Sequence, residues 1–322
     1  MTKKPLEASL SLITATVFWG LSFVVMKALV AAQLKLAPGT STWGLSSLSL
    51  AIRFAVSAGL LFLIKPRQLT TITKLEWKQG LGLGLFGGVG LVLQMDGVNY
   101  TDASTAAFLT QCYCIILPIY AAFRTRQRPG WVILSATLMV LLGIGILSRV
   151  TPQNLKLGRG ELETIGASIL FTGQILWLER PMFHSTRSHW VTFIMFMLTF
   201  LMMAPLLFFS FPSVNSLMRT LQDFHVLVLL GILTLFSTLV AYGLMNYWQP
   251  HVSATHAGLI YCMEPLFASG FSLVLPAIIS SVMMIQYPNE KITSHLLAGG
   301  GLIIGANLII IVQSTIASGK KS

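Results

Sequence analysis

Ten apolar stretches, each long enough to cross a lipid bilayer as a helix, follow one another along this chain. A transmembrane helix needs about 20 consecutive apolar residues, because the hydrocarbon core of a bilayer is about 30 Å thick. The sequence therefore predicts an all-α polytopic membrane protein with ten transmembrane helices. The predicted spans are residues 9–31, 43–64, 77–98, 101–123 and 131–147, followed by 161–183, 190–211, 225–248, 252–275 and 295–315.

The composition excludes most classes of soluble protein. Only 10% of the 322 residues are charged and 54% are hydrophobic, whereas a soluble domain carries about 25% charged residues. These charges are too few to cover the surface of a soluble enzyme, and the chain is too apolar to be disordered. The formal net charge of +11 is explained by membrane topology, so we expect the lipid bilayer as a partner and no nucleic acid.

The distribution of Lys and Arg predicts the orientation of the chain. With a cytoplasmic N-terminus, thirteen basic residues fall in cytoplasmic segments and six in external ones, and Lys27 and Arg53 lie within spans. Cytoplasmic loops of membrane proteins carry the excess of Lys and Arg. We therefore expect both termini in the cytoplasm and the protein in the plasma membrane, which is the inner membrane of a bacterium.

A short repeat relates the two halves of the sequence. Residues 102–110 and 253–261 each open a predicted span with small and hydroxyl side chains, and a proline follows each, Pro118 and Pro265. The copies lie five spans apart, and because five is odd the second copy must enter the membrane upside down. Inverted repeats are typical of secondary transporters. We expect repeats over residues 1–150 and 151–322, with the two prolines kinking matching helices at gating positions.

Short motifs with few charges are spread over almost the whole chain. They are Phe-Trp-Gly-Leu-Ser-Phe at 18–23 followed by Lys27, Arg53-Phe54, residues 101–110 with Pro118, Gly158 with Gly160, and Glu264-Pro265. In these motifs the chain resembles the drug/metabolite transporter superfamily, specifically the EamA-type ten-helix exporters. The resemblance implies two five-helix repeats and export of a small molecule. Loops 34–45 and 277–293 look longer than is usual in that family, which predicts a partly covered outer mouth.

Residues 82–87 match the dinucleotide-binding pattern G-x-G-x-x-G literally. That pattern needs a preceding strand and a following helix, whereas these residues lie within an apolar span. Gly80, Gly84 and Gly88 recur every fourth residue, and this spacing favours close packing against a neighbouring helix. The three cysteines lack the spacing of a zinc site or a disulfide framework. We therefore expect no cofactor, no metal and no enzymatic activity.

Charged side chains within spans carry more information about function. Such residues cost about 2.5–3.5 kcal/mol on insertion scales, so they usually face the bundle interior or a water-filled cavity. Arg53 and Glu264 lie deepest. Lys27 lies nearer a span end, where it either lines the pathway or extends to the membrane surface. His256 precedes Glu264 by two helical turns and is expected on the same face, as a pathway residue or as a helix-to-helix contact.

Uncharged polar and aromatic residues complete the candidate pathway. Each either contacts substrate in a cavity, with aromatic walls suiting a partly apolar ligand, or holds neighbouring helices together. We expect spans one, two, three, four, six, eight and nine to line the cavity, and spans five and ten to pack. The candidates for the substrate pathway are Trp19, Phe23, Lys27, Arg53, Gln94, Gln111, Tyr113, Gln174, Trp177, Tyr242, Asn246, His256, Tyr261 and Glu264.

The sequence thus predicts a secondary transporter that exports a small metabolite, amino acid or drug-like compound by alternating access. The alternatives are a passive facilitator or exchanger, and a membrane-embedded enzyme or assembly factor. Glu264 is the candidate carrier of a coupling proton, because burial favours the neutral carboxyl. The competing interpretation is a structural ion pair between Glu264 and Arg53. The sequence leaves the substrate and the oligomeric state open.

Overall fold

The computed structural model describes residues 4–100, 103–126, 130–147, 158–210, 213–289 and 291–319. Helices make up nearly all of this part of the chain, and no strand occurs within it. The helices are α1 (Lys4–Leu36), α2 (Thr42–Ile64), η1 (Pro66–Thr71), α3 (Lys74–Gly97), α4 (Ala103–Thr110), α5 (Tyr113–Thr125), α6 (Trp131–Leu147), α7 (Arg159–Leu178), η2 (Pro181–Phe183), α8 (Ser188–Ser210), α9 (Val214–Gln222), α10 (Phe224–Ile232), η3 (Leu233–Val240), α11 (Ala241–Trp248), η4 (Gln249–His251), α12 (Ala254–Tyr261), α13 (Glu264–Ser272), α14 (Leu275–Met283) and α15 (Ser294–Gly319).

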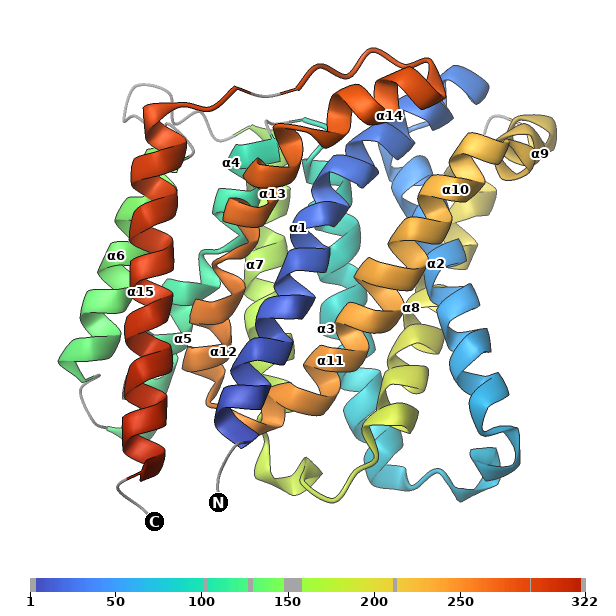
Figure 1. Cartoon of the computed structure of the whole chain (residues 1–322). Helices are drawn as coiled ribbons and strands as arrows, with labels where there is room; N and C mark the ends of the chain where they lie inside the picture. Colours follow the sequence, from blue (N-terminus) through green and yellow to red (C-terminus); the bar gives the residue numbers. More distant parts are fainter. Residues whose placement is uncertain are drawn as a thin grey trace.

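The long helices run side by side in one bundle, and α1 begins at the same end of the bundle at which α15 ends (Figure 1). α6 and α15 pack against each other at one side, as expected for spans five and ten, and α2 packs against α8 at the other. α9 and α14 lie at the end opposite the start of α1 (Figure 1).

Several helices have the length and hydropathy of membrane spans. Five stretches qualify, and α12–α13 with α14 make a sixth when the 54° bend between them is counted within one span. The other predicted spans fall on α4 with α5, α6, α7 and α15. The prediction of an all-helical, multi-pass membrane protein is confirmed at this level. The five stretches are Pro5–Leu36, Thr42–Ile64, Lys74–Gly97, Ser188–Leu207 and Phe224–His251.

The two loops that were expected to be long are partly helical. α1 continues to Leu36, and α2 begins at Thr42 with Ser41 as its N-cap, the Ser41 hydroxyl accepting from the Gly44 amide. The prediction of a long loop over 34–45 is therefore wrong, because the helices extend into it from both sides. α14 occupies the first part of 277–293, and the Lys35 ammonium near the end of α1 donates to the Met284 carbonyl beyond α14.

Two helices are interrupted at corresponding places. α4 is eight residues long and is separated from α5 by Gln111 and Cys112; α12 is also eight residues long and is separated from α13 by Cys262 and Met263. Each break follows the segment that the sequence repeat identifies. α5 packs against α12 while α4 packs against α13, so the two broken helices cross near their breaks.

The prolines of these helices do not occupy matching places, contrary to the prediction. Pro118 lies inside α5, beyond the break. Pro265 is in the first turn of α13, where the missing amide proton costs no helical hydrogen bond. The two-residue breaks, rather than the prolines, are the features that the two halves share.

The glycines of α3 allow close packing, as the sequence predicts. A Cβ atom on Gly80 would lie 2.6 Å from the Cβ of Ile194, and Gly84 and Gly88 face Leu198 and Thr199, all three on α8. Other glycines of α3 face α7, where Gly87 touches the amide of Gln174. The interpretation of residues 80–88 as a packing surface is confirmed.

Buried carboxylates fix both ends of α3. At its start, Glu76 caps the helix and accepts from the Arg187 guanidinium at 2.6 and 2.9 Å and from the Arg187 amide at 3.1 Å. At its end, Asp96 accepts from Arg159 of α7 at 2.5 Å. α3 is thereby tied to α7 and to the residues just before α8, which makes these three helices one firmly connected group.

Candidate substrate cavity

A cavity of about 60 Å³ lies within the bundle. Its wall is built by α1, α2, α3, α4, α5, α7, η3, α11, α12 and α13, which are the seven predicted spans one, two, three, four, six, eight and nine. Both halves of the chain therefore contribute to it. The lining residues are Trp19, Ser22, Met26, Arg53, Leu91, Gln94, Thr110, Tyr113, Phe171, Gln174, Ile175, Ser237, Tyr242, Met245, Tyr261 and Glu264.

Eight of the sequence-predicted pathway residues line this cavity. They share a polar or aromatic side chain on the inner face of a helix. A ninth, Gln111, donates its Nε2 to Glu264 Oε2 at 3.1 Å and so lies next to the wall. The eight lining residues are Trp19, Arg53, Gln94, Tyr113, Gln174, Tyr242, Tyr261 and Glu264.

Three other candidates contact neighbouring helices or the hydrophobic core. Trp177 donates its Nε1 to the Gln79 carbonyl at 3.2 Å, which joins α7 to the start of α3, and its ring lies tilted against that of Phe183 with 5.5 Å between centroids. Asn246 donates to the Thr192 hydroxyl at 2.9 Å, which joins α11 to α8. Phe23 is fully buried in the hydrophobic core. In this conformation none of the three lines the cavity, and their part in a substrate pathway stays a prediction.

The remaining candidates also lie outside the cavity wall. Lys27 is a partly buried residue of α1 that does not line the cavity. His256 belongs to α12 and Glu264 to α13, and the break at Cys262 and Met263 separates them. The shared face of His256 and Glu264 stays a prediction, and of these two residues Glu264 is the one that lines the cavity.

Arg53 is buried and only partly hydrogen-bonded. The residue is 2% exposed, and its Nε donates to the Thr238 hydroxyl at 3.0 Å. Its Nη1 is buried and has no hydrogen-bond partner among the described residues. Thr238 lies in the π-helical segment η3 and donates its own proton to the Leu233 carbonyl at 3.1 Å. A π-helical turn often occurs at functional sites, and here it presents a hydroxyl to the cavity arginine.

Glu264 opens α13 and also faces the cavity. Its Oε2 accepts from Gln111, so the break in one broken helix contacts the break in the other. Both Glu264 and Arg53 lie in the described part of the chain, and no ion pair within 4.0 Å joins them. The interpretation of these two residues as a structural ion pair is wrong in this conformation.

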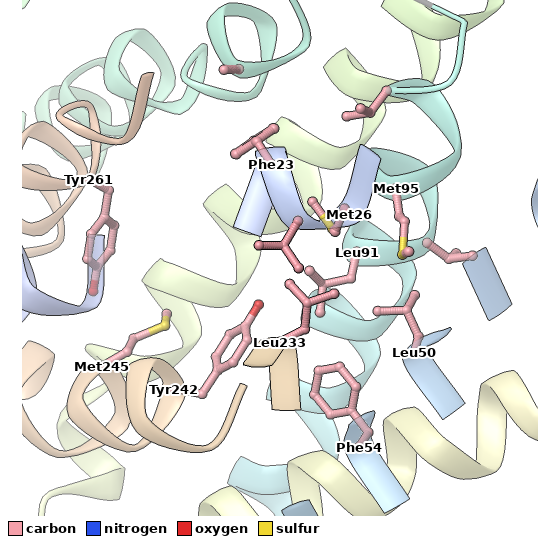
Figure 2. Packing of buried hydrophobic residues seen from close by; sticks show 14 of the residues in the cluster. Phe23, Met26, Leu50, Phe54, Leu91, Met95, Leu233, Tyr242, Met245 and Tyr261 are labelled. Carbon is pink, nitrogen blue, oxygen red and sulfur yellow. The ribbon is translucent and has the colours of Figure 1, made fainter. Parts of the chain in front are cut away.

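Aromatic rings form much of the remaining wall. The ring of Trp19 lies 5.4 Å from that of Tyr242 and 5.3 Å from that of Tyr261, measured between centroids. Figure 2 shows Tyr242 and Met245 projecting from α11 into the same region as Leu91 and Met26. The Tyr261 hydroxyl donates to the Gln249 side-chain oxygen at 2.9 Å, whereas the Trp19 Nε1 is buried and finds no acceptor in the described part of the chain. The wall therefore offers flat apolar surface together with polar groups that are not all satisfied by protein.

Sequence reasoning missed part of the wall. Ser22, Thr110 and Ser237 are small hydroxyl residues within spans, and Phe171 and Met245 resemble the many other apolar residues around them. The hydroxyls of Ser22, Thr110 and Ser237 bond to backbone carbonyls. The sequence feature that could have identified these three residues is a hydroxyl side chain in an otherwise apolar span. This feature is weak evidence for a cavity, because Ser and Thr commonly bond within their own helix.

Comparisons with known proteins agree with the resemblance found in the motifs. Residues 6–149 match the model of the EamA-like transporter family. A protein of Archaeoglobus fulgidus named as an uncharacterized transporter is 25% identical over 281 residues, which cover 85% of this chain and 80% of that protein. A solved crystal structure has the same fold, with a TM-score of 0.63 and 17% sequence identity over 95% of this chain and 98% of that one. The predicted resemblance is confirmed over residues 6–149, which are similar to the EamA-like transporter family, and a membrane transporter role is supported.

Proposed function

We propose that this protein is a secondary transporter that exports a small metabolite, amino acid or drug-like compound across the plasma membrane by alternating access. The observation that carries the proposal is the cavity. Its wall is shared by both halves of the chain and holds two buried charges, Arg53 and Glu264, that form no ion pair within the described residues. Intramembrane charges usually serve a transport pathway or another function. Two broken helices cross beside this cavity, and discontinuous helices are where transporters build substrate sites.

The packing of the helices supports two inverted repeats, over residues 1–150 and 151–322. α1 packs against the α10–η3–α11 stretch and against α12 and α13; in the other half, α7 packs against α3 and against α4 and α5. The first helix of each half thus packs against the third and fourth spans of the other half, as two equivalent repeats require. Such an exchange lets one conformation open to the cytoplasm and its counterpart open to the outside.

The size of the cavity fits a closed stage of such a cycle. A buried water needs about 10–15 Å³, so a cavity of about 60 Å³ has room for a few water molecules only. A larger substrate enters when the helices around the cavity move apart. The broken helices are suited to that movement, because their short halves can tilt separately.

Reporter fusions test the proposed topology. We expect fusions at Arg126 and Lys321 to report a cytoplasmic position and a fusion at Lys156 to report an external one, because the basic residues are concentrated on the proposed cytoplasmic side. Lys156 and Lys321 lie outside the described residues. Opposite signals at all three sites would exclude the proposed orientation, and the same signal at Lys156 as at Lys321 would exclude the inverted relation of the two halves.

Counterflow in proteoliposomes tests the function. Substrates are first selected by comparing the metabolites in the medium of overexpressing and deletion cells, and the enriched compounds are then labelled. We expect saturable exchange of at least one of them. A flux that a pH gradient accelerates in the wild type, but not in Glu264→Gln, assigns a coupling proton to Glu264. Absence of saturable flux for every selected compound would favour a membrane-embedded enzyme or an assembly factor.

A further inference from the structure

A second pocket, the arginine pocket, lies between the ends of two helices and is separate from the substrate cavity. Its volume is about 350 Å³, which is within the range of small-molecule sites, about 300–1,000 Å³. It is formed by the end of α5, the end of α7 and η2, which lies at the end of the bundle where α1 begins (Figure 1). Among the described residues, none lines both spaces. The lining residues of the arginine pocket are Tyr120, Arg124, Leu176, Arg180, Pro181 and Met182.

Two arginines give this pocket a positive charge that no carboxylate of the described residues neutralises. Arg124 of α5 and Arg180 after α7 both line the pocket, and neither takes part in the ion pairs found within the described chain. The neighbouring carboxylate, Glu179, does not line the pocket. Like charges in one pocket repel each other and attract counter-ions. The pocket is therefore suited to an anion that contacts both arginines.

Arg180 is held in place while its hydrogen-bond donors remain available. Its guanidinium carbon lies 4.3 Å from the centroid of the Trp177 ring, and Trp177 is itself fixed by its hydrogen bond to the Gln79 carbonyl. A guanidinium that lies over a ring still presents N–H donors along its edge. Pro181 follows directly and fixes the backbone at the start of η2. Because forked donors match the oxygens of a phosphate group, this arginine is preorganised for such a ligand.

Apolar side chains beside the pocket point away from the bundle. Ile119 and Phe123 of α5 are 63% and 86% exposed, and Met182, which lines the pocket, is 44% exposed. Exposed apolar surface of this kind marks contact with a membrane or a partner. Arg124 is the first residue after the predicted span that ends at residue 123. The pocket therefore lies where the hydrocarbon core gives way to the lipid headgroups.

We propose that the arginine pocket binds the phosphate of an anionic phospholipid, whose acyl chains lie along the exposed apolar residues of α5. A free anion would use only the two arginines, whereas a phospholipid also covers the apolar surface beside them. Two positive charges favour a headgroup with net negative charge over a zwitterionic one, whose ammonium group would meet the arginines. Basic pockets between transmembrane helices on the cytoplasmic side bind such headgroups, and the proposed topology places this end of the bundle there.

Native mass spectrometry of the full-length protein in detergent tests the proposal. The protein is titrated with phosphatidylglycerol or with phosphatidylcholine of the same acyl chains, and inorganic phosphate is then added as a competitor. We expect phosphatidylglycerol to bind at least about tenfold more tightly than phosphatidylcholine, because the charge-assisted contacts favour the anionic headgroup. Inorganic phosphate at the same concentration should leave the bound lipid in place, because it has no acyl chains.

Paired variants separate this pocket from the general charge of the membrane surface. Arg124→Gln/Arg180→Gln should bind phosphatidylglycerol at least about tenfold more weakly than the wild type. Arg67→Gln/Lys74→Gln is the matched control and should bind normally. It removes the same charge from exposed residues on the same proposed side of the membrane, and neither residue lines the pocket. If the first pair fails to fold, the single variants of Arg124 and Arg180 provide the comparison, each with a smaller loss.

Three results would overturn the proposal. Equal binding of phosphatidylcholine would indicate a site for acyl chains alone. Displacement of the lipid by inorganic phosphate would indicate a site for free anions. An equal loss of binding in both paired variants would show that the basic surface attracts lipid without a specific pocket.

Discussion

Replacing Arg187 with methionine is expected to lower the free energy of unfolding by about 3 kcal/mol, the low end of the range for breaking a buried ion pair. The Glu76 carboxylate is 2% exposed, whereas the Arg187 guanidinium is 42% exposed. Removing Arg187 therefore leaves a buried negative charge without its cation, while the water around Arg187 already weakens the pair somewhat. The loss occurs at the start of α3, where Glu76 also accepts from the Thr73 amide.

Chemical unfolding in mixed micelles measures this effect. Arg219→Met is the matched control, because Arg219 is exposed and forms no ion pair among those of the described residues, and it should change stability by less than about 0.5 kcal/mol. The double variant Glu76→Gln/Arg187→Met should lose less than the sum of the two single variants, because the two residues interact directly. An Arg187→Met protein as stable as Arg219→Met would show that this pair does not hold α3.

Replacing Gly20 with alanine is expected to cost about 1–3 kcal/mol, as for overpacking in a tight core, and to abolish most of the transport. A Cβ on Gly20 would lie 2.6 Å from the Cβ of Phe267 and 2.9 Å from the backbone nitrogen of Ala268. These atoms belong to the backbone of α13 or are fixed to it, so they cannot rotate away. α1 and α13 must move apart, which displaces Trp19 and Glu264, both of which line the cavity.

Gly59→Ala is the matched control for this change. Gly59 lies in α2, and nothing lies within 4 Å of the position that a Cβ atom would take there. The same substitution at this site should be neutral or should stabilise the helix by up to about 1 kcal/mol, because alanine has the higher helix propensity. Melting temperature and counterflow, measured on both variants, separate the two cases. Equal stability and equal flux would show that α1 and α13 are not packed as closely as described.

Some features could be predicted from the sequence because they depend on local physical chemistry. The cost of leaving backbone and charged groups in hydrocarbon is a property of each segment, so hydropathy located the helices and marked Arg53 and Glu264 as residues of the interior. The spacing of Gly80, Gly84 and Gly88 along one helix predicted a close neighbour. The seven predicted spans that supply the cavity wall were identified from the polar and aromatic side chains that they carry.

Other features depend on contacts between distant segments. Trp177 contacts α3 and Asn246 contacts α8. These contacts could not be predicted, because every face of an interior helix lies against some neighbour and the sequence does not say which one. Arg187 finds Glu76 more than a hundred residues away in the chain. Sequence spacing carries no information about such a pair, since its geometry is set by how α3 and α8 pack.

The breaks in the two crossing helices show most clearly which features follow from the sequence alone and which depend on the tertiary structure. By itself, the sequence determined that residues 102–110 and 253–261 resemble each other and that proline follows each segment. Only the tertiary structure decided that each helix stops after Thr110 or Tyr261, before either proline, and that Gln111 at one break donates to Glu264 at the other. The physical reason is that a broken helix in a membrane leaves backbone and side-chain polar groups unpaired, and the partner that satisfies them is supplied by the other half of the chain.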